Sequence, residues 1–338
     1  MDKKNIDKIK IGINGFGRIG RTLMRVIQNR QDIEVVAIND LADPATLAHL
    51  LKYDSIHGQF RGIVAGGKNK INVKGNSIRI FEEKDPEKIP WGIFGADIVV
   101  ECTGRFLDEV SAGKHLIAGA KKVILSAPAK GSIKTIVIGV NDEILNGSDL
   151  IVSNASCTTN NAAPMIKILE ESWGIEGAYI TTVHAYTGDQ SLHDAPHRDL
   201  RRSRAAAVSI IPTTTGAAKA VTEIFPKLKG KIGGAGIRVP VINGSLTDLT
   251  CILKKSPPTV EQINKAFKEA SEFGMKEILQ YTDEPIVSVD IIGNTHSCIF
   301  DSQLSSVQGH MVKVVGWYDN EMGYAARLAD LVVKMANA

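Results

Sequence analysis

Cysteine, aromatic residues and long apolar runs are all scarce in this chain of 338 residues. The four cysteines lie far apart and form no CxxC pair, which argues against a disulfide framework and a cysteine-rich metal site, and favours a reducing, cytoplasmic setting. No stretch approaches the roughly 18 apolar residues that a membrane span needs, and the N-terminal MDKKNIDK lacks the apolar core of a signal peptide. We therefore expect neither a membrane partner nor a bound metal.

An excess of charge of one sign is also absent. The 40 basic and 37 acidic residues give a formal net charge of +3, too close to balance to indicate nucleic acid as the main partner. Hydrophobic residues make up 43% and charged residues 23%, which is typical of a globular protein. The length exceeds that of a single hydrophobic core, so we expect two domains.

The pattern of the chain changes near its middle. Up to about Ser153, short β-rich runs such as IKIGIN, IEVVAIND and TIVIGV alternate with helical segments, which predicts an α/β domain with a parallel sheet. Beyond Thr158, longer β-rich stretches such as GAYITTVHAY, PIVSVDII and MVKVVGWYD predict an α+β domain on a mixed or antiparallel sheet. The last segment, EMGYAARLADLVVKMA, has the periodicity of an amphipathic helix that packs on a domain.

Three glycines follow the first predicted strand in the spacing of a dinucleotide-binding turn. Gly15, Gly17 and Gly20 precede an amphipathic helix, and Asp40 ends the next strand, where its carboxylate would reach the ribose hydroxyls. This order predicts a Rossmann-type doubly wound sheet that binds NAD in preference to NADP, because the charge of Asp40 repels an added phosphate. The plainer alternatives are steric glycines and an aspartate that caps a turn.

A cysteine and a histidine stand at the ends of predicted elements. Cys157 follows a β-rich run and begins a helical segment, a position whose free amides favour the thiolate. His184 ends a strand and begins a long polar loop that extends to Arg204, and it would serve as the base of a thiol enzyme. Spacing alone does not bring them together, and a buried structural cysteine with a hydrogen-bonded histidine is the alternative.

Six motifs in order carry a resemblance to one family. NGFGRIG (14–20), ASCTTN (155–160), HAYTGDQ (184–190), RRSRAAA (201–207), IPTTTGAAKAV (211–221) and WYDNEMGY (317–324) are similar to those of phosphorylating glyceraldehyde-3-phosphate dehydrogenases. The resemblance implies that Cys157 attacks the aldehyde, that His184 takes the proton as hydride passes to NAD, and that inorganic phosphate cleaves the thioester. D-Glyceraldehyde 3-phosphate would become 1,3-bisphosphoglycerate, a step of glycolysis and gluconeogenesis.

The same resemblance implies the remaining site residues. The groups that hold the substrate and inorganic phosphate would be Ser156, Thr158, Thr187, Arg202, Thr215, Gly216 and Arg238, with Asp189 orienting an arginine. The cofactor groups would be Gly15, Gly17, Arg18, Ile19, Gly20, Asp40, Thr103, Phe106, Ser126 and Asn320. For Arg201 and Arg204 a solvated face or an intersubunit cluster is the favoured interpretation.

The family also implies an organisation and two rival functions. We expect an NAD-binding domain of residues 1–156, completed by the helix 321–338, a catalytic domain of residues 157–320, and a homotetramer. Asn161 stands where many relatives carry a second cysteine. The alternatives are an erythrose-4-phosphate dehydrogenase, which releases its product with water, and a non-catalytic interaction protein that keeps the fold.

Overall fold

A computed structural model describes residues 8–338, which form two compact units. Unit 1 contains residues 8–136, 143–155 and 325–338, and unit 2 contains Val137–Asp142 and Ser156–Tyr324. Of the N-terminal MDKKNIDK, for which the sequence predicts no signal peptide, only Lys8 lies in the described part. No helix within residues 8–338 is both long and apolar enough to cross a membrane.

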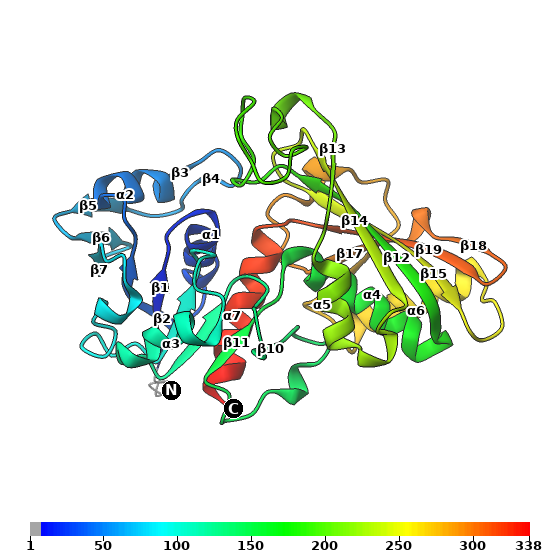
Figure 1. Cartoon of the computed structure of the whole chain (residues 1–338), viewed down its shortest axis with the longest axis horizontal. Coiled ribbons are helices and arrows are strands. Elements are labelled where there is room, and N and C mark those ends of the chain that lie inside the picture. The colour runs from blue at the N-terminus through cyan, green and yellow to red at the C-terminus, as the bar shows by residue number, and fades with distance from the viewer. Residues whose placement is uncertain (1–7) are drawn as a thin grey trace, which may run out of the picture. The chain divides into compact units, whose positions relative to one another are not determined.

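Unit 1 is built on a nine-stranded sheet in the order β10-β11-β9-β8-β1-β2-β7-β6-β5 (Figure 1). The strands from β10 to β7 pair in parallel, and β6 and β5 continue the sheet in antiparallel pairs. The parallel strands are β1 (Ile9–Asn14), β2 (Ile33–Asn39), β7 (Asn76–Phe81), β8 (Ile98–Glu101), β9 (Lys122–Leu125), β10 (Lys134–Thr135) and β11 (Ile151–Ser153). The antiparallel ones are β5 (Val64–Gly67) and β6 (Lys70–Val73). The predicted parallel α/β sheet is confirmed.

The strand order makes β1 the centre of unit 1, because β2 lies on one side of it and β8 on the other. Ligands of such sheets bind at the carboxyl ends of the strands where the order reverses. The helices of this unit are α1 (Arg18–Ile27), α2 (Pro44–Lys52), α3 (Glu109–Ile117) and most of α7 (Met322–Ala336). The apolar face predicted for the last helix is buried at Tyr324, Leu328, Leu331, Val332 and Met335.

Unit 2 is built on a mixed eight-stranded sheet, as the sequence predicts. Its order is β13-β14-β12-β15-β19-β17-β16, with β18 paired to β19; β12–β14 and β16–β17 are parallel and the other pairs antiparallel. The strands are β12 (Ile175–Ala185), β13 (Ile211–Thr213), β14 (Ile232–Val239), β15 (Ser245–Leu253), β16 (Leu279–Thr282), β17 (Cys298–Asp301), β18 (Ser306–Gln308) and β19 (Met311–Tyr318).

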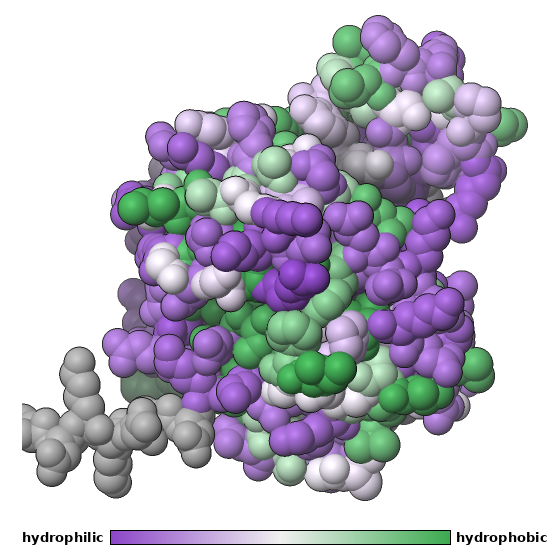
Figure 2. Space-filling view, turned by 90° about the vertical axis from the view of Figure 1, so that its left-hand side faces the viewer, coloured by the Kyte–Doolittle hydropathy of each residue, from purple (hydrophilic) through white to green (hydrophobic). Residues whose placement is uncertain are grey.

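The helices of unit 2 bury their apolar faces against this sheet. They are α4 (Cys157–Trp173), α5 (Ala217–Ile224) and α6 (Val260–Glu272). Residues of α4 and α6 share one core with β12, β15, β17 and β19, and within it the rings of Phe267 and Phe300 stack with centroids 3.9 Å apart. Polar side chains cover most of the face of the chain seen in Figure 2, with apolar ones between them.

Two strand predictions are wrong. Residues 285–292, PIVSVDII, form an irregular segment and a short 3-10 turn, and Val287 and Val289 are exposed. Of TIVIGV (135–140), only Thr135 lies in a strand. Apolar β-branched residues alone do not make a strand without a neighbouring strand that supplies hydrogen-bond partners.

Candidate active site

The glycine turn of unit 1 is shaped by contacts that exclude side chains. Gly15 has a φ of 92°, and a Cβ there would lie 2.8 Å from the Thr103 nitrogen. A Cβ on Gly20 would lie 2.3 Å from the Gly15 oxygen, so the helix α1 packs too closely for any larger residue. At Gly17, the residue before α1, a Cβ would meet nothing within 4 Å. Gly17 therefore borders open space at the positive end of the helix, where a phosphate can bind.

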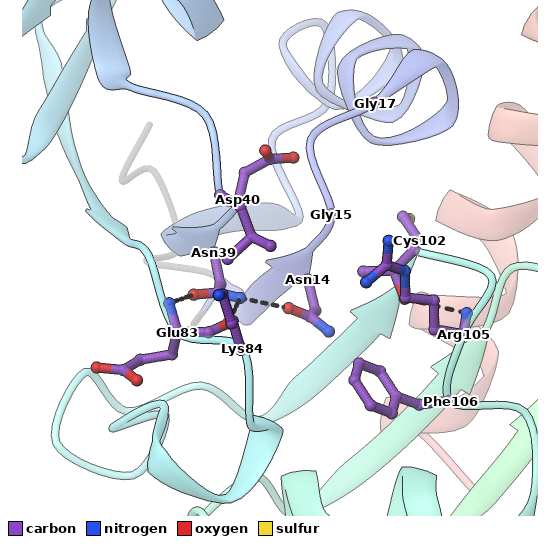
Figure 3. A pocket seen from close by; sticks show the side chains of 12 residues that line it. Asn14, Gly15, Gly17, Asn39, Asp40, Glu83, Lys84, Cys102, Arg105 and Phe106 are labelled. Carbon is purple, nitrogen blue, oxygen red and sulfur yellow. Dashed lines mark hydrogen bonds between the residues drawn. The ribbon is translucent and has the colours of Figure 1, made fainter. Parts of the chain in front are cut away.

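A cavity of about 580 Å³ opens beside this turn (Figure 3). It is lined by Asn14, Gly15, Gly17, Asn39, Asp40, Leu41, Glu83, Lys84, Cys102, Thr103, Arg105 and Phe106. Asp40 accepts hydrogen bonds from the backbone nitrogens of Phe16, at 2.7 Å, and Ala42, at 3.0 Å. The carboxylate that we assigned to the ribose therefore also anchors the glycine turn.

Two of the predicted cofactor residues of unit 1 have further partners. Arg18 pairs with the buried carboxylate of Asp54 at 2.5 Å. Burial would raise the pKa of Asp54, but the Arg18 guanidinium and two backbone N–H groups lower it to about 2. Ser126 follows β9 and donates its backbone N–H to the backbone carbonyl oxygen of Glu101 at 2.9 Å. The Arg18 side chain and the Ser126 backbone thus belong to structural networks of this unit as well.

In unit 2, Cys157 stands at the start of α4 because its neighbours fix the chain there. Ala155 has a φ of 56°, a left-handed conformation that costs a non-glycine residue energy and turns the chain sharply. Ser156 caps the helix, and its hydroxyl accepts a hydrogen bond from the Thr159 nitrogen at 3.1 Å. The cysteine is thereby the first helical residue, beside unpaired amides that can stabilise an oxyanion.

The structure brings the predicted nucleophile and base together. Cys157 Sγ lies 3.5 Å from Nε2 of His184, which is the penultimate residue of β12 and is 5% exposed. The two residues are 27 positions apart in the sequence. The alternative in which they do not meet is thus ruled out within unit 2.

A cationic network lies behind the histidine. Arg238 Nη1 is 2.8 Å from His184 Nδ1 and 3.3 Å from the Thr187 hydroxyl. Thr187 also bonds to Asp189, which accepts from Arg202 at 2.6 Å. Three predicted anion-binding residues, Thr187, Arg202 and Arg238, therefore form one connected group with the base, and Asp189 orients Arg202.

Burial and Arg238 set the protonation of the pair. Burial and, to a smaller extent, the charge of Arg238 together lower the pKa of His184 to about 3. Burial raises the pKa of the Cys157 thiol, while the charge of Arg238 and hydrogen bonds of Thr158 act in the opposite direction. The backbone N–H groups at the helix start do favour the thiolate, as we expected, but the cost of burying the charge is larger and raises the pKa overall. Both shifts favour the uncharged forms, a thiol beside a neutral imidazole.

Comparison with known proteins decides the family. The model of the glyceraldehyde 3-phosphate dehydrogenase NAD-binding domain matches residues 9–109, and that of the family's C-terminal domain matches residues 156–320. The chain belongs to the glyceraldehyde 3-phosphate dehydrogenase family. A glyceraldehyde-3-phosphate dehydrogenase of Streptomyces coelicolor is 53% identical over 333 residues, which cover 97% of this chain and 99% of that protein. Those of Mycobacterium avium and Geobacillus stearothermophilus are each 54% identical over 331 residues and cover 96–97% of this chain and 97–98% of their own.

Membership of the glyceraldehyde 3-phosphate dehydrogenase family makes the chain an NAD-dependent oxidoreductase. The cavity of unit 1 fits that cofactor, because the open space at Gly17 and the start of α1 suit a pyrophosphate and Asp40 suits a ribose. Within residues 8–338, no group of three or more histidine, cysteine, aspartate and glutamate side chains could hold a metal ion.

The other predicted residues of this family member occupy three places. Thr158 lies in the first turn of α4, and its hydroxyl bonds to that of Tyr318 at 2.9 Å. Thr215 and Gly216 precede α5, where the Thr215 hydroxyl accepts from the Ala217 nitrogen at 3.2 Å. The buried Asn320 accepts a hydrogen bond from Ser245 through Oδ1 at 2.9 Å, so its amide hydrogens point elsewhere.

Sequence reasoning missed several residues that the structure places in these sites. Tyr318 contacts the Thr158 and Thr182 hydroxyls and meets the His184 ring edge to face. Its position inside the WYDNEMGY motif was the available signal. In unit 1 the missed residues of the cavity are Asn14, Asn39, Glu83, Lys84, Cys102 and Arg105. Asn14 and Asn39 end their strands, a position that could have drawn attention to them.

Proposed function

We propose that this chain converts D-glyceraldehyde 3-phosphate, NAD and inorganic phosphate into 1,3-bisphosphoglycerate and NADH through a thioester on Cys157. The contact of 3.5 Å between Cys157 Sγ and His184 Nε2, with Arg238 directly behind the imidazole, carries this proposal. Bound NAD supplies the hydride acceptor. The names of the relatives support the substrate.

The neutral resting pair suggests how protons move. As Sγ attacks the aldehyde carbon, the thiol proton passes to Nε2 of His184 and then to the carbonyl oxygen, which gives a hemithioacetal and restores the neutral imidazole. When the carbon loses its hydride, the hydroxyl proton of the hemithioacetal passes to the same nitrogen. Phosphate then attacks the thioester carbon, and the thiolate leaves and is protonated.

Two groups of residues are proposed to hold the anions of this reaction. The connected residues Thr187, Arg202 and Arg238 hold one phosphate close to the base, because charge-assisted hydrogen bonds are the strongest that side chains offer to an anion. Ser156, Thr158, Thr215 and Gly216 hold the second, at the starts of α4 and α5. For NAD we propose Arg18, Ile19 and Gly20 at the pyrophosphate, Thr103 and Phe106 at the adenine, and Ser126 and Asn320 at the nicotinamide.

The organisation of the protein is part of the proposal. Residues 1–156 with 321–338 are proposed as the NAD-binding domain and residues 157–320 as the catalytic domain, in keeping with the two matched family models. We further propose a cytoplasmic homotetramer.

The deciding experiment follows NADH formation from glyceraldehyde 3-phosphate with and without inorganic phosphate. We expect sustained turnover only with phosphate, and a loss of at least about 10⁴-fold in Cys157→Ser, because nucleophilic catalysis is removed. Cys251→Ala, a core cysteine of the same unit, is the control and should retain activity. Turnover that needs no phosphate would favour the erythrose-4-phosphate dehydrogenase alternative. An inert protein that forms no acyl-Cys157 would favour a non-catalytic role.

A further inference from the structure

Glu101 is a buried carboxylate for which neither the fold nor the proposed reaction accounts. It ends β8 and is 0% exposed, next to β1 at the centre of the sheet of unit 1. Four hydrogen-bond donors meet its two oxygens. Asn14 Nδ2 and His115 Nε2 lie 2.5 and 3.2 Å from Oε2, and the Thr103 nitrogen and hydroxyl bond to Oε1. A proton on this carboxyl group would face one of those donors, so the group is an ionised, acceptor-only side chain.

The histidine does not neutralise that charge. Trp91 Nε1 donates to His115 Nδ1 at 3.0 Å, which requires a lone pair on Nδ1 and therefore a hydrogen on Nε2 only. His115 is 0% exposed and is thus a neutral donor to Glu101. The negative charge is balanced by hydrogen bonds alone, an arrangement in which the loss of one acceptor leaves buried donors unpaired.

From Glu101 a chain of amides crosses the carboxyl ends of the neighbouring strands. Asn14 ends β1 and Asn39 ends β2, and Asn39 Nδ2 donates to Asn14 Oδ1 at 2.8 Å (Figure 3). Just beyond β7, Asn39 Nδ2 also donates to the backbone carbonyl oxygen of Glu83 at 2.9 Å, and Asn39 Oδ1 accepts from the Glu83 backbone nitrogen at 2.8 Å. We call Glu101, Asn14 and Asn39 the amide strip. It joins the ends of β8, β1 and β2 to the segment after β7.

The amide strip has a fixed direction at both ends. An amide group can turn over and exchange its donor and acceptor ends, but Glu101 can only accept. Asn14 must therefore present its NH₂ to Glu101 and its oxygen to Asn39, whose own direction is fixed by the backbone N–H and C=O of Glu83. Thr103, which Glu101 holds through two bonds, lies against Gly15 of the glycine turn. Asn14, Asn39 and Thr103 all line the cavity of unit 1.

We propose that Glu101 is a positioning residue for the adenosine half of NAD. Its two oxygens hold the Asn14 amide and the Thr103 segment beside the glycine turn, so that this half of the cavity is formed before the dinucleotide binds. The inference rests on NAD binding by unit 1 and does not depend on the thioester chemistry of unit 2. It therefore stands or falls separately from the proposed reaction.

The test is equilibrium binding of NAD and of ADP-ribose to the full-length Glu101→Gln protein by calorimetry. The substituted glutamine has the same shape but directs an NH₂ group at some of the four donors, and we expect both Kd values to rise about tenfold, the change that unpaired buried donors produce. The alkylation rate of Cys157 by iodoacetamide in the NAD-free protein should stay at its parental value, which shows that unit 2 is intact.

A matched double variant separates positioning from a merely structural role. When Asn14→Asp is combined with Glu101→Gln, the new aspartate can only accept, from the new glutamine amide and from Asn39, while the glutamine oxygen keeps both Thr103 donors. The hydrogen bonds of residue 14 to both neighbours are restored and only the His115 donor stays unpaired, so we expect most of the ADP-ribose affinity to return, whereas Asn14→Asp alone, which places two carboxylates together, should bind worst. Parental affinity in Glu101→Gln, or a double variant that neither folds nor binds better than Glu101→Gln, would overturn the proposal.

Discussion

His184 and Arg238 face each other across the parallel pair β12–β14, and Arg238 Nη1 lies 2.8 Å from Nδ1 of the imidazole. His184 Nδ1 also lies 2.7 Å from the backbone carbonyl oxygen of Ala185. It can accept from Arg238, which leaves a hydrogen on Nε2, or donate to Ala185, which leaves Nε2 free to take a proton. By its contact with Nδ1, Arg238 thus influences whether Nε2, the nitrogen that faces Cys157, carries a hydrogen.

Replacing Arg238 with glutamine should therefore change the pKa values of both His184 and Cys157. Its charge lowers the pKa of His184 and that of Cys157, so in Arg238→Gln both pKa values rise. We expect the midpoint of the pH profile of Cys157 alkylation to move to higher pH. The kcat/KM for the phosphorylated aldehyde should fall about 10- to 100-fold with the loss of a charge-assisted hydrogen bond.

The control for this prediction is Arg202→Gln. Arg202 binds Asp189 and Thr213 and is the weakest of the influences on His184. The Arg202→Gln variant should have a lower kcat/KM, while the midpoint of the pH profile of Cys157 alkylation should stay nearly unchanged. Equal midpoint shifts in the two variants would show that Arg238 has no special role.

How much of this arrangement the sequence predicts depends on the distance over which each contact forms. The glycine turn and the helix start at Cys157 are local, and their residues can be read from a few neighbouring positions. The contact of His184 with Arg238 joins positions 54 apart and requires β14 to pair with β12, which no local pattern specifies. Tyr318 reaches the site from β19, across β15 from β12, so only the fold reveals it.

The pKa of Cys157 shows the same limit in energetic terms. The sequence indicates the helix amides that favour a thiolate, but burial depends on packing from the whole of unit 2. The strand predicted at 285–292 failed for a related reason, since its apolar residues have no neighbouring strand. The local patterns therefore predict the glycine turn and the start of α4, whereas burial and strand pairing depend on several elements together and were not predicted.

Alanine substitutions at Gly17 and Gly20 of the cofactor turn should affect stability and NAD affinity differently. Gly17→Ala adds a Cβ into open space, so the protein should keep its Tm and lose NAD affinity, because the methyl group occupies the phosphate position. Gly20→Ala adds a Cβ only 2.3 Å from the Gly15 oxygen, so it should lower the Tm as well. Thermal unfolding and NAD calorimetry on both variants distinguish them; a normal Tm in Gly20→Ala would contradict the packing argument.

Asp40 connects cofactor choice to the shape of the turn. Asp40→Asn keeps an acceptor for the Phe16 nitrogen but removes the charge. We expect kcat/KM with NAD to fall about tenfold, as for one weakened charge-assisted bond, and the preference for NAD over NADP to narrow. Asp43→Asn, a change at the cap of α2, is the control and should alter neither value. An unchanged cofactor preference in Asp40→Asn would refute the electrostatic reason.

The Tyr318 hydroxyl should stabilise the wall behind the nucleophile. Burial raises its pKa, so it stays protonated and joins the Thr158 and Thr182 hydroxyls, at 2.9 and 2.8 Å. Tyr318→Phe should reduce the free energy of unfolding by about 1–3 kcal/mol and lower kcat, since Thr158 follows Cys157 directly. Urea denaturation measures the first effect. Tyr179→Phe, at a half-exposed position, should cost almost nothing; equal losses would contradict the assignment.

Oxidation of Cys157 should end without an internal disulfide. The position one turn along α4, which in many relatives is a cysteine, is the buried Asn161, whose Nδ2 contacts the Ser297, Gly316 and Trp317 oxygens at 3.2–3.3 Å. The other cysteines of unit 2, Cys251 and Cys298, are buried, and burial raises the pKa of each thiol. Peroxide should thus produce sulfenic acid on Cys157, or a mixed disulfide when a small thiol is present.

Mass spectrometry of the peroxide-treated protein tests this directly, and Asn161→Cys provides the positive control. Residues four apart on a helix have Cβ atoms about 5–6 Å apart, slightly beyond the roughly 3.5–4.5 Å of a disulfide. This variant should therefore form the bond between positions 157 and 161 as the first turn of α4 loosens, and recover activity with a reductant. Asn161→Ser should behave like the parent, because it changes the same contacts without adding a thiol. A parental protein in which Cys157 is mainly bonded to another cysteine of its own chain, whether Cys102, Cys251 or Cys298, would contradict the prediction.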